Sequence, residues 1–140
     1  MPVPVPVPVP VPMIVVDTSA LMALLLGEPE AEAIAWALEG AEALAISAGT
    51  LAEALIVAGR RGVGEEMARL VEGLGFEVEA VSPAAARRVA GAYAAWGKGV
   101  HPAGLNFGDC FAYALARERR APLLFVGEDF ARTDLAAALA

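Results

Sequence analysis

The sequence predicts an α/β fold, a three-layer α/β/α sandwich around a four- or five-stranded, mainly parallel sheet. Short apolar runs alternate along the chain with longer segments of helical composition. The first and last of these runs, at 13–16 and 122–126, are apolar without interruption, as is typical of strands that are buried on both faces. Because strands that alternate with helices form parallel sheets covered on both sides, these patterns together favour this architecture.

Residues 1–12 differ in kind from the rest of the chain. Pro2 to Pro12 reads "PVPVPVPVPVP", so every second residue lacks a backbone N–H and has a fixed φ, which excludes a helix or an interior strand. We expect polyproline II or disorder there, in a tail that is not a native part of the domain. A Pro-rich ligand segment is the alternative, although the charged flanks of such ligands are absent. The single domain is then expected at 13–140.

The first half of the domain is expected to hold two strands and four helices. In order these are a strand at 13–16, helices at 18–27 and 28–40, a strand at 42–47, and helices from about 50 to 61 and from about 65 to 74. Thr18 or Ser19 supplies a capping oxygen for the first helix, and Gly27 ends it. Pro29 suits the first turn of the second helix, where a missing N–H costs no hydrogen bond.

For the second half of the domain, the sequence predicts two strands and three helices. They are a strand at 76–81, a helix at 82–97, a helix at 106–120, a strand at 122–126 and a short final helix at 134–140. The alternating pattern of 76–81 indicates an edge strand. Ser82 and Asn106 are the caps of the two longer helices, and Pro83 occupies the first helical position after Ser82.

Charge and composition limit the possible functions. The net charge of −7 gives an acidic surface that repels nucleic acid in general, so binding it would need local cations, metal ions or a partner. One cysteine, Cys110, and one histidine, His101, exclude an internal disulfide and a typical structural zinc site. No apolar stretch approaches the roughly 20 residues of a membrane span, and no signal peptide is evident. We therefore expect a cytoplasmic protein.

The acidic residues are distributed unevenly. Of seventeen acids only four are aspartate. Asp17 and Asp129 each follow a predicted buried strand, and ligands of open parallel sheets bind beyond the carboxyl ends of the strands. Asp17, Asp109 and Asp134 also have a simpler explanation as helix caps, and Glu53 could lie on a solvated helix face. Asp129 has no apparent capping role.

Carboxylates that converge on one cleft need a counter-charge, because they cannot all stay ionised beside one another. The chain has only one histidine and one lysine beside its nine arginines, and we expect a divalent metal ion to supply this counter-charge. Ligand sets made only of oxygen select Mg²⁺ or Mn²⁺. Such ions serve phosphoryl chemistry by activating water and stabilising a leaving oxygen.

The segments that carry these features resemble a known family. They are "IVVDTSALMALLLGEPEA", "SAGTLAEALIV" and "GLNFGDCFAYALARERRAPLLFVGEDFARTDL". Together they are similar to the PIN-domain family, and within it to the VapC branch of toxin ribonucleases, over nearly all of 13–140. The resemblance implies Mg²⁺- or Mn²⁺-dependent cleavage of RNA. The implied catalytic acids are Asp17, Glu53, Asp109 and Asp129, the implied metal ligands are Asp17, Asp109 and Asp129, and the implied supporting residues are Thr18, Ser19 and Asp134.

The resemblance also implies partners. They are an RNA substrate, a VapB-like antitoxin that blocks the cleft, and a second copy of the chain in a homodimer. A cleft rich in carboxylates is a suitable target for an arginine of the antitoxin. The main candidates for holding RNA phosphates are Arg60, Lys98, His101 and Arg132, and the remaining ones are Arg61, Arg117, Arg119 and Arg120.

Other interpretations stay open at this point. The run "VVDTS" after a strand also suits a phosphatase with an aspartyl nucleophile, but that chemistry needs a second Asp where Ser19 stands. A nucleophilic pair of Cys110 and His101 is possible in principle. A catalytically inactive relative that only binds an antitoxin is the third alternative, and the presence of all four acids in the expected order argues against it.

Overall fold

The computed structural model describes residues 11–139, and within them it confirms the predicted α/β fold. The sheet has four parallel strands in the order β3-β2-β1-β4. The strands are β1 (Val11–Val16), β2 (Ala41–Ser47), β3 (Glu77–Glu79) and β4 (Leu123–Leu124). β1 and β2 are therefore central, and all strands end at the same edge of the sheet.

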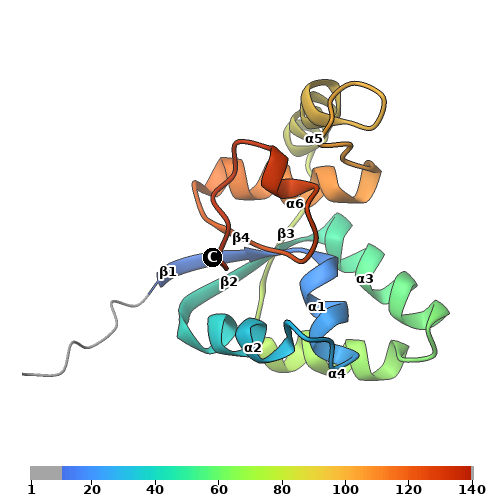
Figure 1. Cartoon of the computed structure of the whole chain (residues 1–140), viewed down its shortest axis with the longest axis vertical. Helices are drawn as coiled ribbons and strands as arrows, with labels where there is room; N and C mark the ends of the chain where they lie inside the picture. Colours follow the sequence, from blue (N-terminus) through green and yellow to red (C-terminus); the bar gives the residue numbers. More distant parts are fainter. Residues whose placement is uncertain (1–10, 140) are drawn as a thin grey trace, which may run out of the picture.

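Helices cover both faces of the sheet (Figure 1). They are α1 (Thr18–Leu25), α2 (Ala31–Gly40), α3 (Ala48–Arg60), α4 (Gly64–Leu74), α5 (Pro83–Trp96) and α6 (Phe107–Arg119). The predicted caps Ser82 and Asn106 are confirmed, since each side chain accepts a backbone N–H of its helix. α1 differs from the expectation, because its cap is Asp17 rather than Thr18 or Ser19. No helix in the described part of the chain is long and apolar enough to cross a bilayer.

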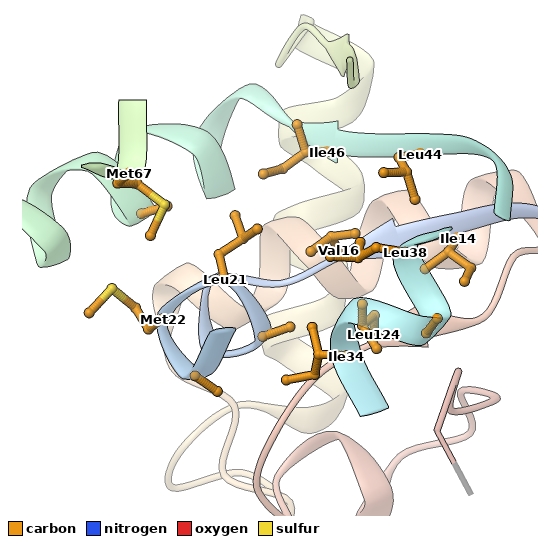
Figure 2. Packing of buried hydrophobic residues seen from close by; sticks show 14 of the residues in the cluster. Ile14, Val16, Leu21, Met22, Ile34, Leu38, Leu44, Ile46, Met67 and Leu124 are labelled. Carbon is orange, nitrogen blue, oxygen red and sulfur yellow. The ribbon is translucent and has the colours of Figure 1, made fainter. Parts of the chain in front are cut away.

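The core has two layers, because neighbouring residues of a strand point to opposite faces of the sheet. Val16 of β1 packs with α1, α2 and α4 on one face, around Leu21, Ile34 and Met67 (Figure 2). Val15, the preceding residue, packs with α5 and α6 on the other face. The two buried layers hold the ends of the strands, and hence the residues that follow them, in fixed positions.

The first strand begins earlier than predicted. β1 extends back to Val11, which pairs with Ala41, so the last two residues of the predicted 1–12 tail belong to the sheet; the rest of the tail, 1–10, lies outside the described residues. The pairing of β1 with β2 omits Pro12, whose ring nitrogen has no hydrogen to donate. Because β4 reaches back only to Val15, β1 has a neighbour on one side at Pro12, and a proline is tolerated there.

The predicted helix at 134–140 is wrong over its described part, and β4 is shorter than 122–126. The chain instead returns along β4, where the N–H of Leu123 donates to the carbonyl of Ala136 at 3.0 Å and that of Ala138 donates to the carbonyl of Leu123 at 2.9 Å. A helix this short gains little by itself. The open edge of β4, by contrast, presents backbone groups that need partners.

Candidate active site

The first candidate acid, Asp17, directly follows β1 and caps α1. Its side chain is only 2% exposed, because it lies where the buried sheet meets the helix. One carboxylate oxygen, Oδ2, accepts hydrogen bonds from the backbone N–H of Ser19 at 3.0 Å and from the Ser19 hydroxyl at 2.7 Å. The other oxygen, Oδ1, is buried and has no hydrogen-bond partner. Since an unpartnered buried oxygen is costly, a ligand bound to Oδ1 would stabilise this site.

Two hydroxyl groups connect Asp17 to other parts of the fold. The Ser19 hydroxyl also accepts the backbone N–H of Val126 at 3.0 Å, which ties α1 to the segment after β4. The Thr18 hydroxyl donates to Oε1 of Glu53 at 2.6 Å. Both residues that were expected to support the first acid therefore contact an acid directly, Ser19 at Asp17 and Thr18 at Glu53.

Glu53 comes from the second turn of α3 and lies against the start of α6. A Cβ atom built at Gly108 would overlap the Glu53 carboxylate. The absence of a side chain at Gly108 therefore provides the space in which Glu53 reaches Thr18. The alternative that Glu53 lies on a freely solvated helix face does not hold, since the side chain is half-buried between α3 and α6.

Asp109 lies in the first turn of α6 and forms a reciprocal capping box with Asn106. Its Oδ2 accepts the backbone N–H of Asn106 at 3.0 Å, while Oδ1 of Asn106 accepts the backbone N–H of Asp109 at 2.8 Å. The capping role considered for Asp109 is therefore real. It uses one carboxylate oxygen, fixes the direction of the side chain, and leaves the other oxygen available.

Asp129 follows β4 in an exposed turn, immediately before the short helix η1 (Phe130–Arg132). Its side chain makes no capping hydrogen bond. The neighbouring Glu128 is 85% exposed and forms an ion pair with Arg132, at 3.6 Å. Of the two acids in "GEDF", only Asp129 influences Asp109 electrostatically.

The electrostatics indicate that all four acids face one region. Burial raises the pKa of Asp17 from 3.8 to about 6; the hydrogen bonds from Ser19 oppose this, and the charges of Asp109 and Glu53 add to it. Burial also raises the pKa of Asp109 from 3.8 to about 6; its backbone hydrogen bond to Asn106 opposes this, and the charges of Asp129 and Glu53 add to it. Acids far apart in sequence thus influence one another beyond the carboxyl edge of the sheet.

The chemistry of these residues fits a hard divalent cation. The donors are carboxylate oxygens, one of them buried without a partner, and their mutual repulsion is what a cation would relieve. Within residues 11–139, however, no three acidic, histidine or cysteine side chains already form a ready-made ligand cluster. Asp17 and Glu53 are instead held by the hydroxyls of Ser19 and Thr18. The fit to a metal therefore rests on donor type and charge.

The structure gives Asp134, the predicted supporting acid, other partners. Its Oδ1 accepts the hydroxyl of Tyr113 at 2.7 Å, and its Oδ2 lies 3.6 Å from the Arg117 guanidinium. Asp134 is not among the charges that act on Asp17 or Asp109. Its role in the structure is to anchor the segment that follows Asp129.

The predicted RNA-binding cations occupy different places. Arg132 belongs to the Asp129 segment and donates to the carbonyl of Pro102 at 3.2 Å, which joins this segment to the loop that holds Lys98 and His101. Arg60 is exposed at the end of α3, two helical turns beyond Glu53. Two of the remaining candidates are engaged by acids, Arg117 by Asp134 and Arg119 by Glu77 and Glu79.

Two residues that matter for this geometry were not predicted from the sequence. Gly108 provides space for Glu53, and Tyr113 holds Asp134. Tyr113 follows Asp109 by one helical turn, a spacing that could have drawn attention to it. The importance of Gly108 depends on a contact between α3 and α6 that no local pattern reveals.

Comparisons with known proteins agree with this fold. The PIN-domain family matches residues 14–135. Ribonuclease VapC28 of Mycobacterium tuberculosis is 44% identical over 129 residues, which cover 89% of this chain and 97% of the relative. Ribonuclease VapC36 of the same organism is 45% identical over 125 residues, which cover 86% of this chain and 90% of the relative.

Solved structures show the same architecture. The crystal structure of VapC20 from Mycobacterium tuberculosis superposes with a TM-score of 0.74 at 17% identity and covers 91% of this chain and 99% of its own. VapBC-5 from that organism, a member of the VapBC family of toxin–antitoxin systems, has a TM-score of 0.59 at 25% identity and covers 91% and 95%. Together with the family match and the curated relatives, this means that the chain belongs to the PIN-domain family, in its VapC branch.

Proposed function

We propose that this protein is the ribonuclease toxin of a toxin–antitoxin pair and that it hydrolyses RNA phosphodiester bonds with Mg²⁺ or Mn²⁺ bound at its carboxylates. The observation that carries the proposal is the convergence of Asp17, Glu53, Asp109 and Asp129, from four separate elements, on one edge of the sheet. The VapC relatives, which are named ribonucleases, support the same activity.

In this mechanism Asp17, Asp109 and Asp129 hold the metal, and Glu53 completes the site or orients the attacking water. The bound ion supplies activation of that water and stabilisation of the leaving oxygen. Ser19 occupies one oxygen of Asp17 with two hydrogen bonds, which leaves the buried Oδ1 as the free donor. Thr18 holds Glu53 in place through its hydroxyl. The hydroxyls of Ser19 and Thr18 thus fix the orientations of the Asp17 and Glu53 carboxylates.

The Asp129 side of the site is where we expect the RNA backbone to bind. Arg132 lies in the same segment as Asp129 and joins it to the loop of Lys98 and His101. Lys98 and Arg132 are exposed, and their positive charge offsets the repulsion of phosphates by the surrounding acids. The metal provides the remaining counter-charge.

Exposed apolar side chains support the proposed antitoxin and homodimer. Trp36 on α2 is 73% exposed and Ile56 on α3 is 60% exposed, and large apolar side chains that remain outside the core commonly mark interaction sites. A cavity of about 400 Å³ opens beside Glu53 and is lined by Gly49, Ala52, Glu53, Ile56, Phe107, Gly108 and Phe111. An antitoxin segment on this surface would cover Glu53. A protein that stays monomeric throughout the micromolar range would contradict the homodimer.

The activity can be tested with a matched pair of variants in neighbouring positions. Asp129→Asn and Glu128→Gln each remove one carboxylate from the same turn, but only Asp129 acts on Asp109. With purified protein and a single-stranded RNA of mixed sequence, we expect cleavage in Mg²⁺ or Mn²⁺ by the wild type and by Glu128→Gln. Chelation by EDTA should stop it, and Asp129→Asn should reduce it strongly. Cleavage that survives EDTA, or full activity of Asp129→Asn, would refute the proposal.

A further inference from the structure

A chain of hydrogen bonds outside the carboxylate cluster links α5, α6 and the C-terminal segment. The indole N–H of Trp96 donates to the Tyr113 hydroxyl at 2.8 Å, and this hydroxyl donates to Oδ1 of Asp134 at 2.7 Å. The direction is fixed by chemistry, because an indole N–H can only donate and an ionised carboxylate can only accept. A hydrogen bond to an ionised acceptor is also among the stronger kinds.

The position of Tyr113 connects this chain to the candidate site. Tyr113 follows Asp109 by four residues on α6, so the two side chains lie on the same side of the helix, one turn apart. Asp109 is the third acid, and Tyr113 holds the segment that carries the fourth. One rigid helix therefore carries both, and Tyr113 itself is buried.

The segment that contains Asp129 is anchored at both of its ends. Before Asp129, the N–H of Val126 donates to the Ser19 hydroxyl at 3.0 Å. After it, Asp134 is held by Tyr113 and lies 3.6 Å from Arg117. The Asp129 side chain makes no capping hydrogen bond of its own. Its place relative to Asp109 therefore depends on the backbone between these anchors, where the next residue, Phe130, is buried in the core.

We propose that Tyr113 is a positioning residue of the carboxylate site, which acts through Asp134 to fix the segment that carries Asp129 relative to Asp109. The inference rests on the proposed function for its biological meaning, but the quantity that it predicts is the affinity of the site for a metal ion. Removing the hydroxyl would leave Asp134 with only its ion pair to Arg117, while the ring keeps its place in the core. Partners that orient metal ligands typically contribute about 10- to 100-fold to metal affinity.

The test measures Mn²⁺ binding to the full chain from the electron paramagnetic resonance signal of free Mn²⁺. Tyr113→Phe should weaken binding about tenfold, and Asp134→Ala should do the same. The double variant should bind no more weakly than Asp134→Ala alone, because that single variant already removes the hydrogen bond to Tyr113. The matched control is Tyr93→Phe on α5, which removes a tyrosine hydroxyl that donates to the carbonyl of Lys98 at 3.3 Å. It should bind Mn²⁺ as the wild type does.

The outcomes separate this role from a purely structural one. A structural role predicts that Tyr113→Phe melts at a lower temperature while the folded protein binds Mn²⁺ with wild-type affinity, and that result would overturn the proposal. Additive losses in the double variant, or a wild-type protein that binds no Mn²⁺, would overturn it as well. If the variants lose Mn²⁺ affinity as expected but the wild type cleaves no RNA, the positioning role stands and the proposed function fails.

Discussion

Replacing Asp17 by asparagine should inactivate the protein and yet stabilise its metal-free form. At neutral pH the folded chain holds a carboxylate that is 2% exposed, and burial raises its pKa from 3.8 to about 6. At about 1.4 kcal/mol for each pH unit of difference, holding this charge in the folded state costs about 3 kcal/mol at pH 7. The asparagine side chain would carry no charge, and its amide oxygen can still accept the two hydrogen bonds from Ser19, so the helix cap remains.

The sign of the pH dependence follows from the raised pKa. The folded protein binds the Asp17 proton more tightly than the unfolded chain does, so metal-free wild type should gain stability as the pH falls from about 6 to about 4. The asparagine variant lacks this contribution. Its advantage should be at most about 3 kcal/mol near pH 7 and about half of that near pH 5.

Urea denaturation in EDTA at the two pH values measures this difference directly. Asp109, whose pKa is also raised to about 6, is present in both proteins, so the comparison of variant with wild type reports on Asp17 together with its interaction with Asp109. Glu128→Gln is the control for loss of an exposed charge and should change little. An Asp17→Asn protein that is less stable than wild type near pH 7, or whose advantage does not shrink at the lower pH, would refute the reasoning. So would undiminished RNA cleavage.

Two further predictions follow from the site. Gly108→Ala should keep the fold, as judged by circular dichroism, but abolish most RNA cleavage. The new Cβ would occupy the place of the Glu53 carboxylate and displace it from the Thr18 hydroxyl. An active Gly108→Ala protein would contradict the assigned position of Glu53. Mn²⁺ affinity should rise between about pH 5 and about pH 7 and then level off. Protons compete with the ion at Asp17 and Asp109, because the pKa values of both are raised to about 6. Calorimetric titration at several pH values would show a flat affinity profile if these two acids were not ligands.

The order of strands and helices could be predicted because it depends on local signals. Apolar runs, capping residues such as Ser82 and Asn106, and glycine or proline at helix ends act within a few residues of each other. The start of β1 could not, because the local preference of Pro12 against a strand is outweighed by pairing of Val11 with Ala41. The C-terminal segment likewise follows the edge of β4 rather than its own helical composition.

The candidate acids could be named from the sequence because aspartate and glutamate at strand ends and helix starts are visible there. Their supports were only partly visible. Thr18 and Ser19 were expected beside the first acid, but the contact of Thr18 with Glu53 joins α1 to α3 across the fold. Asp134 was expected as a supporting residue, but its partners Tyr113 and Arg117 could not be read from the sequence. Side-chain partners of this kind depend on tertiary packing, which no single segment encodes.

The central claim is that the carboxylate site binds a divalent ion through Asp17, Asp109 and Asp129, and anomalous diffraction from crystals grown with Mn²⁺ tests it most directly. We predict a Mn²⁺ peak about 2 Å from Oδ1 of Asp17, with a second ligand oxygen from Asp109. The peak should be absent from crystals of Asp17→Asn that have the same fold. A fully occupied Mn²⁺ site elsewhere on the protein, or none near Asp17 at saturating Mn²⁺, would contradict the account.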